Sequence, residues 1–344
     1  MNIEVIDLFC GAGGLTCGLR KSGLNVKAGF DIDGICKYPY EVNNHAKFIC
    51  KDIRNVTPQE VKELYSNNSI KVLAGCAPCQ PFSQMTKKYK NSQSKDEKYN
   101  LLLEFGRLVK GILPDIISME NVPEIRKTSI FKEFLDILET NGYKVDYKVV
   151  YCPDYGIPQN RRRFVLLAAK EQISLIAKTH SKENYRTVRD TISNLPPIGN
   201  GEICPTDILH QTAKLSDINL KRIRSSKPGG TWYDWPEELR CNCHKKESGK
   251  TYASVYGRME WDKIAPTMTT QFYCYGTGRY GHPEQDRALT LREGALIQTF
   301  PIEYQFVDPN KAFTLKEVAR EIGNAVPVRL GEIIGESIKK YLGE

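Results

Sequence analysis

The stretch Ile3-Glu4-Val5-Ile6-Asp7-Leu8-Phe9-Cys10-Gly11-Ala12-Gly13-Gly14-Leu15 decides the fold of this chain. Its first half has the apolar pattern of a strand, and the glycines that follow are typical of a tight turn into a helix. A strand, a glycine-rich turn and a helix form a nucleotide-type cofactor site, because glycine lets the backbone approach the ligand closely. The spacing is not that of a dinucleotide site, because Thr16 stands where the third glycine of Gly-x-Gly-x-x-Gly belongs.

Beyond this stretch, short β-rich runs alternate with helical patterns. We expect strands at 3–9, 26–30, 71–75, 116–119, 144–150 and 163–168, a poorly marked strand ending at 52–53, and an amphipathic helix at 130–141. This alternation predicts an α/β fold with a doubly wound, mostly parallel sheet.

The alternation is lost from about Lys170, where Gly, Pro, Trp and Tyr become frequent, so we expect a smaller, loop-rich second domain. Helical patterns return with a capping box at Thr314, and one face of the last helix carries Leu330, Ile334, Ile338 and Tyr341. That face predicts packing on the first domain. We therefore divide the chain into 1–170 plus 312–344, and 171–311.

Composition narrows the class of protein. The 344 residues carry a net charge of +8, which is consistent with a polyanionic partner, and lysines crowd the segment 84–98. A second basic cluster lies at 221–227. No apolar run approaches the roughly 18 residues of a membrane span, so we expect no contact with a membrane. Eleven cysteines without a framework spacing or an export signal predict reduced thiols and a cytoplasmic protein.

Cys79 is the candidate nucleophile. It follows Pro78 just after the expected strand at 71–75, and Glu120 ends the next one. Both therefore belong to the carboxyl edge of the sheet, where such folds do chemistry. A thiolate adds to C6 of a pyrimidine if a carboxylic acid at N3 receives the electron density. The alternatives are a small hydrophobic residue in a loop for Cys79 and a helix cap or surface ion pair for Glu120.

Further candidates stand at other strand ends. Asp31 can hold a ribose hydroxyl, and Asp52 with Ile53 suits an adenine amino group and ring. Alternating side chains place Arg161 and Arg163 on one face of the last expected strand, where a guanidinium can hold a base carbonyl or a phosphate. A solvated loop acid and a solvated basic patch are the alternatives for Asp52 and the arginines.

Together these segments resemble the DNA cytosine-5 methyltransferase family of the bacterial and phage type. The matching motifs, which cover most of the chain in the family's order, are Asp7 to Leu15, Pro78-Cys79-Gln80, Glu120-Asn121-Val122, Gln159 to Arg163, Arg258 with Trp261 to Thr267, Arg292-Glu293 before Gln298 to Pro301, and Gly323 to Pro327. Each motif alone has modest specificity, but the whole series leaves little room for coincidence. The family pattern requires the thiol after proline, so Cys76 is assigned to packing.

The resemblance implies a Rossmann-like, S-adenosylmethionine-dependent methyltransferase fold with a target-recognition domain. It implies a cofactor site formed by Phe9, Gly11, Ala12, Gly14, Asp31, Ile32, Asp52, Ile53, Pro78, Leu101 and Asn324. By the same likeness Cys79 attacks C6 of a cytosine flipped out of double-stranded DNA, Glu120 contacts N3 and the exocyclic amine, and Arg163 braces the carbonyl. Arg161 is counted with these catalytic residues, and 84–98 corresponds to a mobile loop that closes over DNA.

The family type also implies a sequence-specific enzyme of the prokaryotic cytosol, which we expect to be a monomer with a separately acting restriction endonuclease as its companion. Methylation of tRNA by the same residues is one alternative. A catalytically idle DNA-binding regulator is another, against which the intact Cys79, Glu120 and Arg163 count. A nicotinamide or flavin oxidoreductase is disfavoured by Thr16.

This chemistry requires no metal. The segment Cys241-Asn242-Cys243-His244 invites a zinc interpretation, with Cys204 as a conceivable further ligand. Its spacing is Cys-x-Cys and not Cys-x-x-Cys, and no second pair follows at finger spacing. We therefore expect no metal at this segment.

Overall fold

The computed structural model describes residues 1–78, 100–247, 249 and 253–344. The chain forms two compact units, of which the first comprises Met1–Tyr155, Arg162–Thr179 and Ala325–Glu344, and the second Gly156–Arg161 and His180–Asn324. The sequence places the boundaries at 170 and 312. The two divisions thus differ at 171–179, which lie in the first unit, and at 156–161 and 312–324, which lie in the second.

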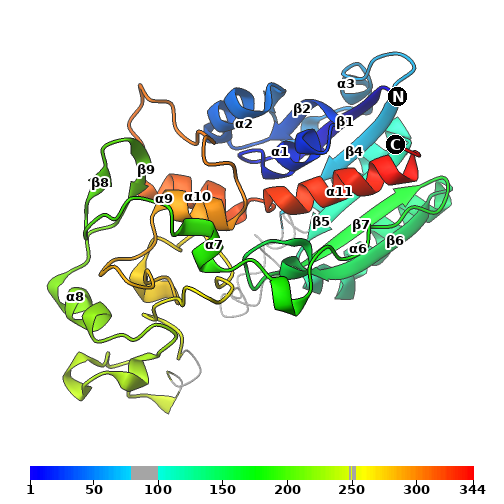
Figure 1. The fold of residues 1–344 in the computed structure, drawn as a ribbon. Coiled ribbons are helices and arrows are strands. Elements are labelled where there is room, and N and C mark those ends of the chain that lie inside the picture. The colour runs from blue at the N-terminus through cyan, green and yellow to red at the C-terminus, as the bar shows by residue number, and fades with distance from the viewer. Residues whose placement is uncertain (79–99, 248, 250–252) are drawn as a thin grey trace. The chain divides into compact units, whose positions relative to one another are not determined.

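The first unit is built on one seven-stranded sheet (Figure 1). Its strands are β1 (Ile3–Leu8), β2 (Asn25–Asp31), β3 (Lys47–Cys50), β4 (Ile70–Gly75), β5 (Ile116–Asn121), β6 (Lys144–Tyr151) and β7 (Arg162–Ala169), in the order β3-β2-β1-β4-β5-β7-β6. β1 to β5 pair in parallel, whereas β7 runs antiparallel to both β5 and β6. The predicted mostly parallel sheet is confirmed. The poorly marked third strand is β3, which ends at Cys50, short of the expected end at 52–53.

Helices cover both faces of this sheet, as the fully buried pattern of β1 requires. They are α1 (Gly14–Lys21), α2 (Lys37–Asn44), α3 (Pro58–Lys62), α5 (Leu101–Ile112), α6 (Ser129–Thr140) and α11 (Val328–Tyr341), with the 3-10 helices η1 (Gly34–Cys36), η2 (Ile53–Asn55), η4 (Pro123–Lys127) and η5 (Cys152–Tyr155). Ile6 and Leu8 pack in one core cluster with Phe105 of α5 and Phe134 of α6. Asp7 points to the other face, where it accepts a hydrogen bond of 2.7 Å from Thr16 of α1.

The last helix, α11, lies against α1, as the sequence predicts (Figure 1). The backbones approach so closely that a Cβ at Gly18 would lie 2.1 Å from the carbonyl oxygen of Val328. A Cβ at Gly331 would lie 2.8 Å from that of Leu15. Only glycine fits at such a crossing, so this packing fixes α1 against a helix from the other end of the sequence.

The second unit is rich in loops, with short elements. These are α7 (Val188–Ile192), β8 (Ile203–Cys204), β9 (Asp207–Gln211), α8 (Asp217–Arg224), α9 (Leu291–Ile297) and α10 (Leu315–Asn324), and the 3-10 helices η6 (Lys182–Asn184), η7 (Trp232–Asp234), η8 (Glu237–Leu239) and η10 (Tyr275–Thr277). The predicted capping box at Thr314 is present, because its hydroxyl accepts from Glu317 N at 3.2 Å. In the part of the chain that the structure describes, no helix combines the length and the hydropathy needed to cross a bilayer.

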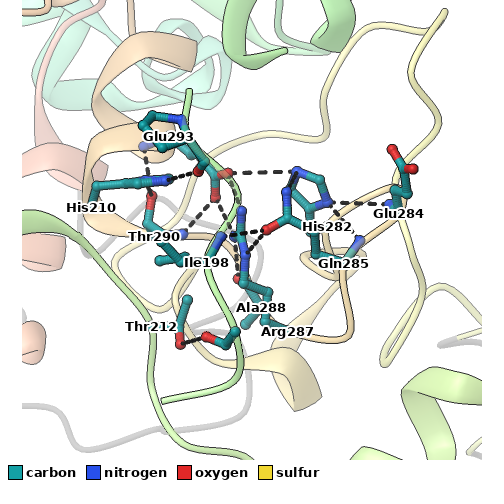
Figure 2. Close-up of polar contacts among 12 residues, drawn as sticks. Ile198, His210, Thr212, His282, Glu284, Gln285, Arg287, Ala288, Thr290 and Glu293 are labelled. Atoms are coloured by element: carbon teal, nitrogen blue, oxygen red, sulfur yellow. Dashed lines mark hydrogen bonds and ion pairs between the residues drawn. The ribbon is translucent and has the colours of Figure 1, made fainter. Parts of the chain in front are cut away.

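A buried polar network holds α9 in the second unit (Figure 2). The Arg287 guanidinium donates to both oxygens of Glu293, at 2.9 and 2.8 Å. Thr290 and Glu293 form the capping box of α9, and His282 Nε2 lies 3.7 Å from the Glu293 carboxylate. Burial raises the pKa of Glu293, but the charge and hydrogen bonds of Arg287, together with His282 and the Thr290 backbone, outweigh burial and hold that pKa at about 2. Burial also lowers the pKa of His282 to about 4.

Candidate active site

The glycine-rich turn after β1 leaves room for a ligand beside the backbone. Phe9, Gly11 and Gly13 all have positive φ angles of 60°, 50° and 91°. A Cβ at Gly11 would meet nothing within 4 Å. No described side chain caps the N-terminus of α1, and its first turn holds no acidic residue. The positive end of the α1 dipole therefore favours an electron-rich group at this place.

Asp31 stands at the carboxyl end of β2 and is tied to this turn. Its Oδ2 accepts from Gly11 N at 2.8 Å, and its Oδ1 accepts from Asp33 N at 2.9 Å. Burial raises the pKa of this carboxyl, although the two backbone donors oppose the shift. Each oxygen keeps a further lone pair for a ligand hydroxyl. Ile32 follows with 66% of its surface exposed, which leaves an apolar side chain next to the acid.

The next strand end presents Asp52 and Ile53. Asp52 caps η2 and forms an ion pair of 2.6 Å with Arg54, whose hydrogen bonds lower the pKa of Asp52. Ile53 is buried, and Phe9 and Leu101 pack against the same core cluster. Phe9 and Leu101 are partly buried, so each keeps some apolar surface that a ligand could contact.

The described residues of this region fit a nucleotide-type cofactor such as S-adenosylmethionine. They offer an open glycine turn, an acid for hydroxyl groups and partly buried apolar side chains. Ala12 and Gly14 are buried in the same turn, and Pro78 is half-buried after β4. Asn324 is the exposed last residue of the second unit.

Glu120 lies on β5, 2% exposed, with a partner on each oxygen. Its Oε1 forms an ion pair of 2.9 Å with Arg163 Nε on β7. Its Oε2 accepts from the thiol of Cys76 at 2.7 Å. The neighbouring Asn121 donates to the carbonyl oxygen of Ala77 at 3.1 Å, so the segment after β4 is held to the end of β5 by two bonds. This segment leads directly into Cys79 in the sequence.

Cys79 itself, and the lysine-rich segment 84–98, lie outside the described residues. The assignment of Cys76 to packing alone is wrong, because its thiol is a hydrogen-bond donor to Glu120. The donor is missed from sequence because nothing in the spacing of the loop shows which way Cys76 points.

The expected sharing of one strand face by Arg161 and Arg163 is also wrong, because β7 begins at Arg162. Alternation applies only inside a strand. Arg161 is buried in the second unit, where it donates to Gln159 Oε1 at 3.2 Å and to the carbonyl oxygen of Met268 at 3.0 Å. Arg163 remains the arginine that contacts Glu120.

The aromatic residues of the loop-rich second unit differ in burial. Trp232 and Trp235 are each 2% exposed and belong to a small core in the second unit, whereas Tyr233 is 44% exposed. The buried network of Arg287 and Glu293 is not predicted from sequence. Its signal was present, because Thr290-Leu291-Arg292-Glu293 has the spacing of a capping box.

Sheet and turn together define a Rossmann-like α/β protein of the kind that binds a nucleotide cofactor at the carboxyl edge of its strands. The family model for C-5 cytosine-specific DNA methylases matches residues 3–340. The type II methylase M.HgiDII of Herpetosiphon aurantiacus is 57% identical over 342 residues, which are 98% of this chain and 95% of that protein. The type II methyltransferase M1.BsuMI of Bacillus subtilis is 32% identical over 97% of this chain and 79% of its own length.

Solved structures show the same fold. A prophage-encoded E. coli protein described as a DNA modification methyltransferase has a TM-score of 0.77 at 23% identity, with 99% of this chain and 100% of that chain covered. The S. pombe Dnmt2 methyltransferase has a TM-score of 0.66 at 17% identity, with the same coverage. The chain belongs to the C-5 cytosine-specific DNA methylase family and is a DNA cytosine-5 methyltransferase.

Proposed function

We propose that this enzyme transfers the methyl group of S-adenosylmethionine to C5 of a cytosine flipped out of a specific short sequence in double-stranded DNA. The observation that carries the proposal is the cluster of Glu120, Arg163 and Cys76 at the sheet edge, immediately before Cys79. The likeness to type II methylases over almost the whole chain supports a role as the modification enzyme of a restriction-modification system.

The first unit offers the residues for both substrates apart from Asn324, which belongs to the second unit and stays a prediction from the family likeness. Phe9, Gly11, Ala12, Gly14, Asp31, Ile32, Asp52, Ile53, Pro78, Leu101 and Asn324 are proposed to hold S-adenosylmethionine, whose sulfonium supplies the methyl group when bound. The Cys79 thiolate would form a bond from Sγ to C6 of the cytosine. Glu120 would stabilise N3 as the ring accepts this electron pair, and Arg163 would hold the ring carbonyl. After C5 is methylated, loss of its proton returns the electron pair and expels Cys79. Arg161 stays a prediction from the family likeness.

The second unit, which contains residues 180–311 of the predicted domain 171–311, is proposed as the target-recognition domain. An open groove lined by Lys221, Arg224 and Ser225 lies at the end of α8. Arg224 also pairs with Asp286 at 3.1 Å. Cationic side chains beside a groove suit DNA phosphates, and contacts of this kind weaken as salt rises. We further propose a monomer in the cytoplasm whose companion restriction endonuclease acts separately.

The test is to express the enzyme in a host that lacks cytosine methylation and to map 5-methylcytosine in the host genome by bisulfite sequencing. We expect methylation at one recurring short sequence. Transfer of labelled methyl groups to tRNA without any methylation of DNA would contradict the proposal. The idle-regulator alternative predicts binding of DNA with no methylation of either nucleic acid.

The role of Cys79 has its own test. DNA that contains 5-fluorocytosine is incubated with the enzyme and S-adenosylmethionine. After methyl transfer the fluorinated ring has no C5 proton to lose, so the bond between Cys79 and C6 should persist as a covalent adduct. We expect the adduct with the wild type and with the matched variant Cys204→Ser, and none with Cys79→Ser. An adduct of undiminished yield with Cys79→Ser would refute the assignment.

A further inference from the structure

A turn in the second unit brings three metal-ligating side chains together. The ligand atoms of Cys241, Cys243 and His244 all lie within 4.8 Å of one another. Donor atoms that share one tetrahedral zinc ion lie roughly 3.5 Å apart. Small side-chain rotations therefore bring this cluster to the spacing of a filled site.

The backbone closes this turn on itself. His244 N donates to the carbonyl oxygen of Cys241 at 2.9 Å, and Cys241 N donates to His244 Nδ1 at 3.3 Å. Gly249 packs on the same turn so tightly that a Cβ there would lie 2.0 Å from the carbonyl oxygen of Cys243. The turn gathers its ligands without Cys-x-x-Cys spacing, so the argument from spacing against a metal loses its force.

His244 is held in an aromatic pocket and has an unused ring nitrogen. Only 5% of the residue is exposed, and its ring stacks on Trp232 with centroids 4.3 Å apart and planes 11° apart. Tyr256 meets the same ring edge-on at 5.8 Å. His244 Nε2 is buried and has no hydrogen-bond partner among the described residues. A metal at Nε2 would move the ring proton to Nδ1, and the long hydrogen bond of 3.3 Å from Cys241 N would be given up in exchange. A buried polar atom without a partner is destabilising, and a bound ligand would remove that cost.

The surroundings explain why a metal would be useful here. Around the turn, the described part of the chain forms the short 3-10 helices η7 and η8 and a small core of Trp232, Trp235 and Leu239. Small cores of this kind are commonly stabilised by a metal ion. The guanidinium of Arg222 lies over the rings of Trp235 and Tyr256, at 5.8 and 5.4 Å from their centroids.

We propose that Cys241, Cys243 and His244 bind one zinc ion, which acts as a structural clamp of the second unit. Two thiolates balance the charge of the ion, and soft sulfur ligands favour zinc over magnesium or calcium. Cys243 is exposed, so solvent takes the fourth position. The site therefore differs from a closed zinc finger in being open to chelators. This proposal reverses our expectation from the sequence.

The test uses the full-length, untagged enzyme purified without chelators. We expect about one zinc ion per chain by mass spectrometry of the metal content. After exchange with Co²⁺, we expect thiolate-to-cobalt charge-transfer absorption together with the visible bands of a four-coordinate site. Chelation should lower the thermal midpoint of the wild type.

Two variants form a matched pair, because both remove an exposed thiol. Cys243→Ser should lose the zinc and the cobalt bands, and chelation should no longer shift its midpoint, whereas Cys50→Ser should behave like the wild type. The proposal is overturned if the wild type holds no zinc and shows no cobalt bands, or if Cys243→Ser retains both. The cobalt spectrum of the wild type decides the question even if the variant fails to fold.

Discussion

Each of the two units contains a buried glutamate paired with an arginine, and the two pairs are built differently. In the second unit, Glu293 and Arg287 both have side chains that are 1% exposed, and two hydrogen bonds join them. In the first unit, Glu120 is 3% and Arg163 15% exposed, and their ion pair has a shortest contact of 2.9 Å through Nε. The same two residue types thus form a closed pair in one unit and a more open pair in the other.

The difference teaches how to tell a structural pair from a reactive one. Glu293 also accepts from Thr290 N at 2.8 Å, so rigid groups occupy its oxygens and a ligand could displace them only at great cost. Glu120 Oε2 accepts a hydrogen bond from the thiol of Cys76, which is a weak donor, and Oε1 has no hydrogen-bond partner among the described residues beyond the Arg163 ion pair. A base that enters the site can take over these contacts. Of the two pairs, Glu120 with Arg163 has the weaker hydrogen bonding, and we expect this pair to change partners during a reaction.

The largest expected effect is on catalysis, and it distinguishes Glu120 from Glu293. Glu120→Gln removes the acid and should lower kcat by about 10²–10⁴-fold, because proton transfer or charge stabilisation at N3 is lost. Transfer of tritiated methyl groups to DNA measures this change. The free energy of unfolding should stay close to that of the wild type. If kcat remained within a factor of two, Glu120 would not have the proposed role.

Glu293→Gln should have the reverse outcome. It leaves the Arg287 guanidinium buried without its counter-charge, so the free energy of unfolding should fall by about 3–5 kcal/mol. All three tryptophans, Trp232, Trp235 and Trp261, lie in the second unit, so tryptophan fluorescence in urea reports on this unit directly. Equal stability of Glu293→Gln and the wild type would remove the distinction between the two pairs.

The pH dependence of the free energy of unfolding should be set by Glu293, which pairs with Arg287, and by the neighbouring His282. The folded pKa values of His282, about 4, and Glu293, about 2, both lie below their usual values of 6.5 and 4.5. The unfolded chain therefore binds these protons more tightly, so stability falls as the pH falls. The His282 contribution should be lost between pH 6.5 and about 4, and that of Glu293 between 4.5 and about 2. Each shift corresponds to about 3 kcal/mol.

Urea unfolding at a series of pH values measures this dependence. In His282→Gln, the loss of stability above pH 4.5 should disappear, while the loss below pH 4.5, which comes from Glu293, should remain. A slope in this variant as steep as that of the wild type above pH 4.5 would show that other groups control the acid sensitivity of the second unit.

The smallest expected effect on kcat comes from replacing Cys76, whose thiol is the weak hydrogen-bond donor to Glu120. Cys76→Ala removes the hydrogen bond to Glu120 Oε2, and a loss of about 1 kcal/mol corresponds to a roughly five-fold lower kcat. Cys76→Ser keeps a donor and should restore most of the rate. Equal rates for Cys76→Ala and the wild type would mean that Cys76 does not position Glu120.

The sequence predicts the first unit well. Its strands are apolar, its glycines after the first strand form a turn, and the topology of a parallel sheet places the carboxyl ends of the strands at one edge. Topology therefore places Glu120 at the carboxyl edge correctly, whereas Arg163 is assigned to the same site only through the family likeness. The sequence fails for Cys76 and Arg161, because the direction of a loop side chain and the first residue of a strand depend on tertiary contacts. The Glu293 network is missed because His210 on β9 and the loop residues His282 and Arg287 show no common periodicity in the sequence.

The close crossing of α1 and α11 has a consequence for the order of synthesis. Gly18 lies against Val328, so the helix that follows the glycine-rich turn is covered by a segment translated after the whole second unit. On the ribosome, the packing of α1 cannot be completed until residues 328–341 have emerged. The second unit therefore has time to fold before the first is finished.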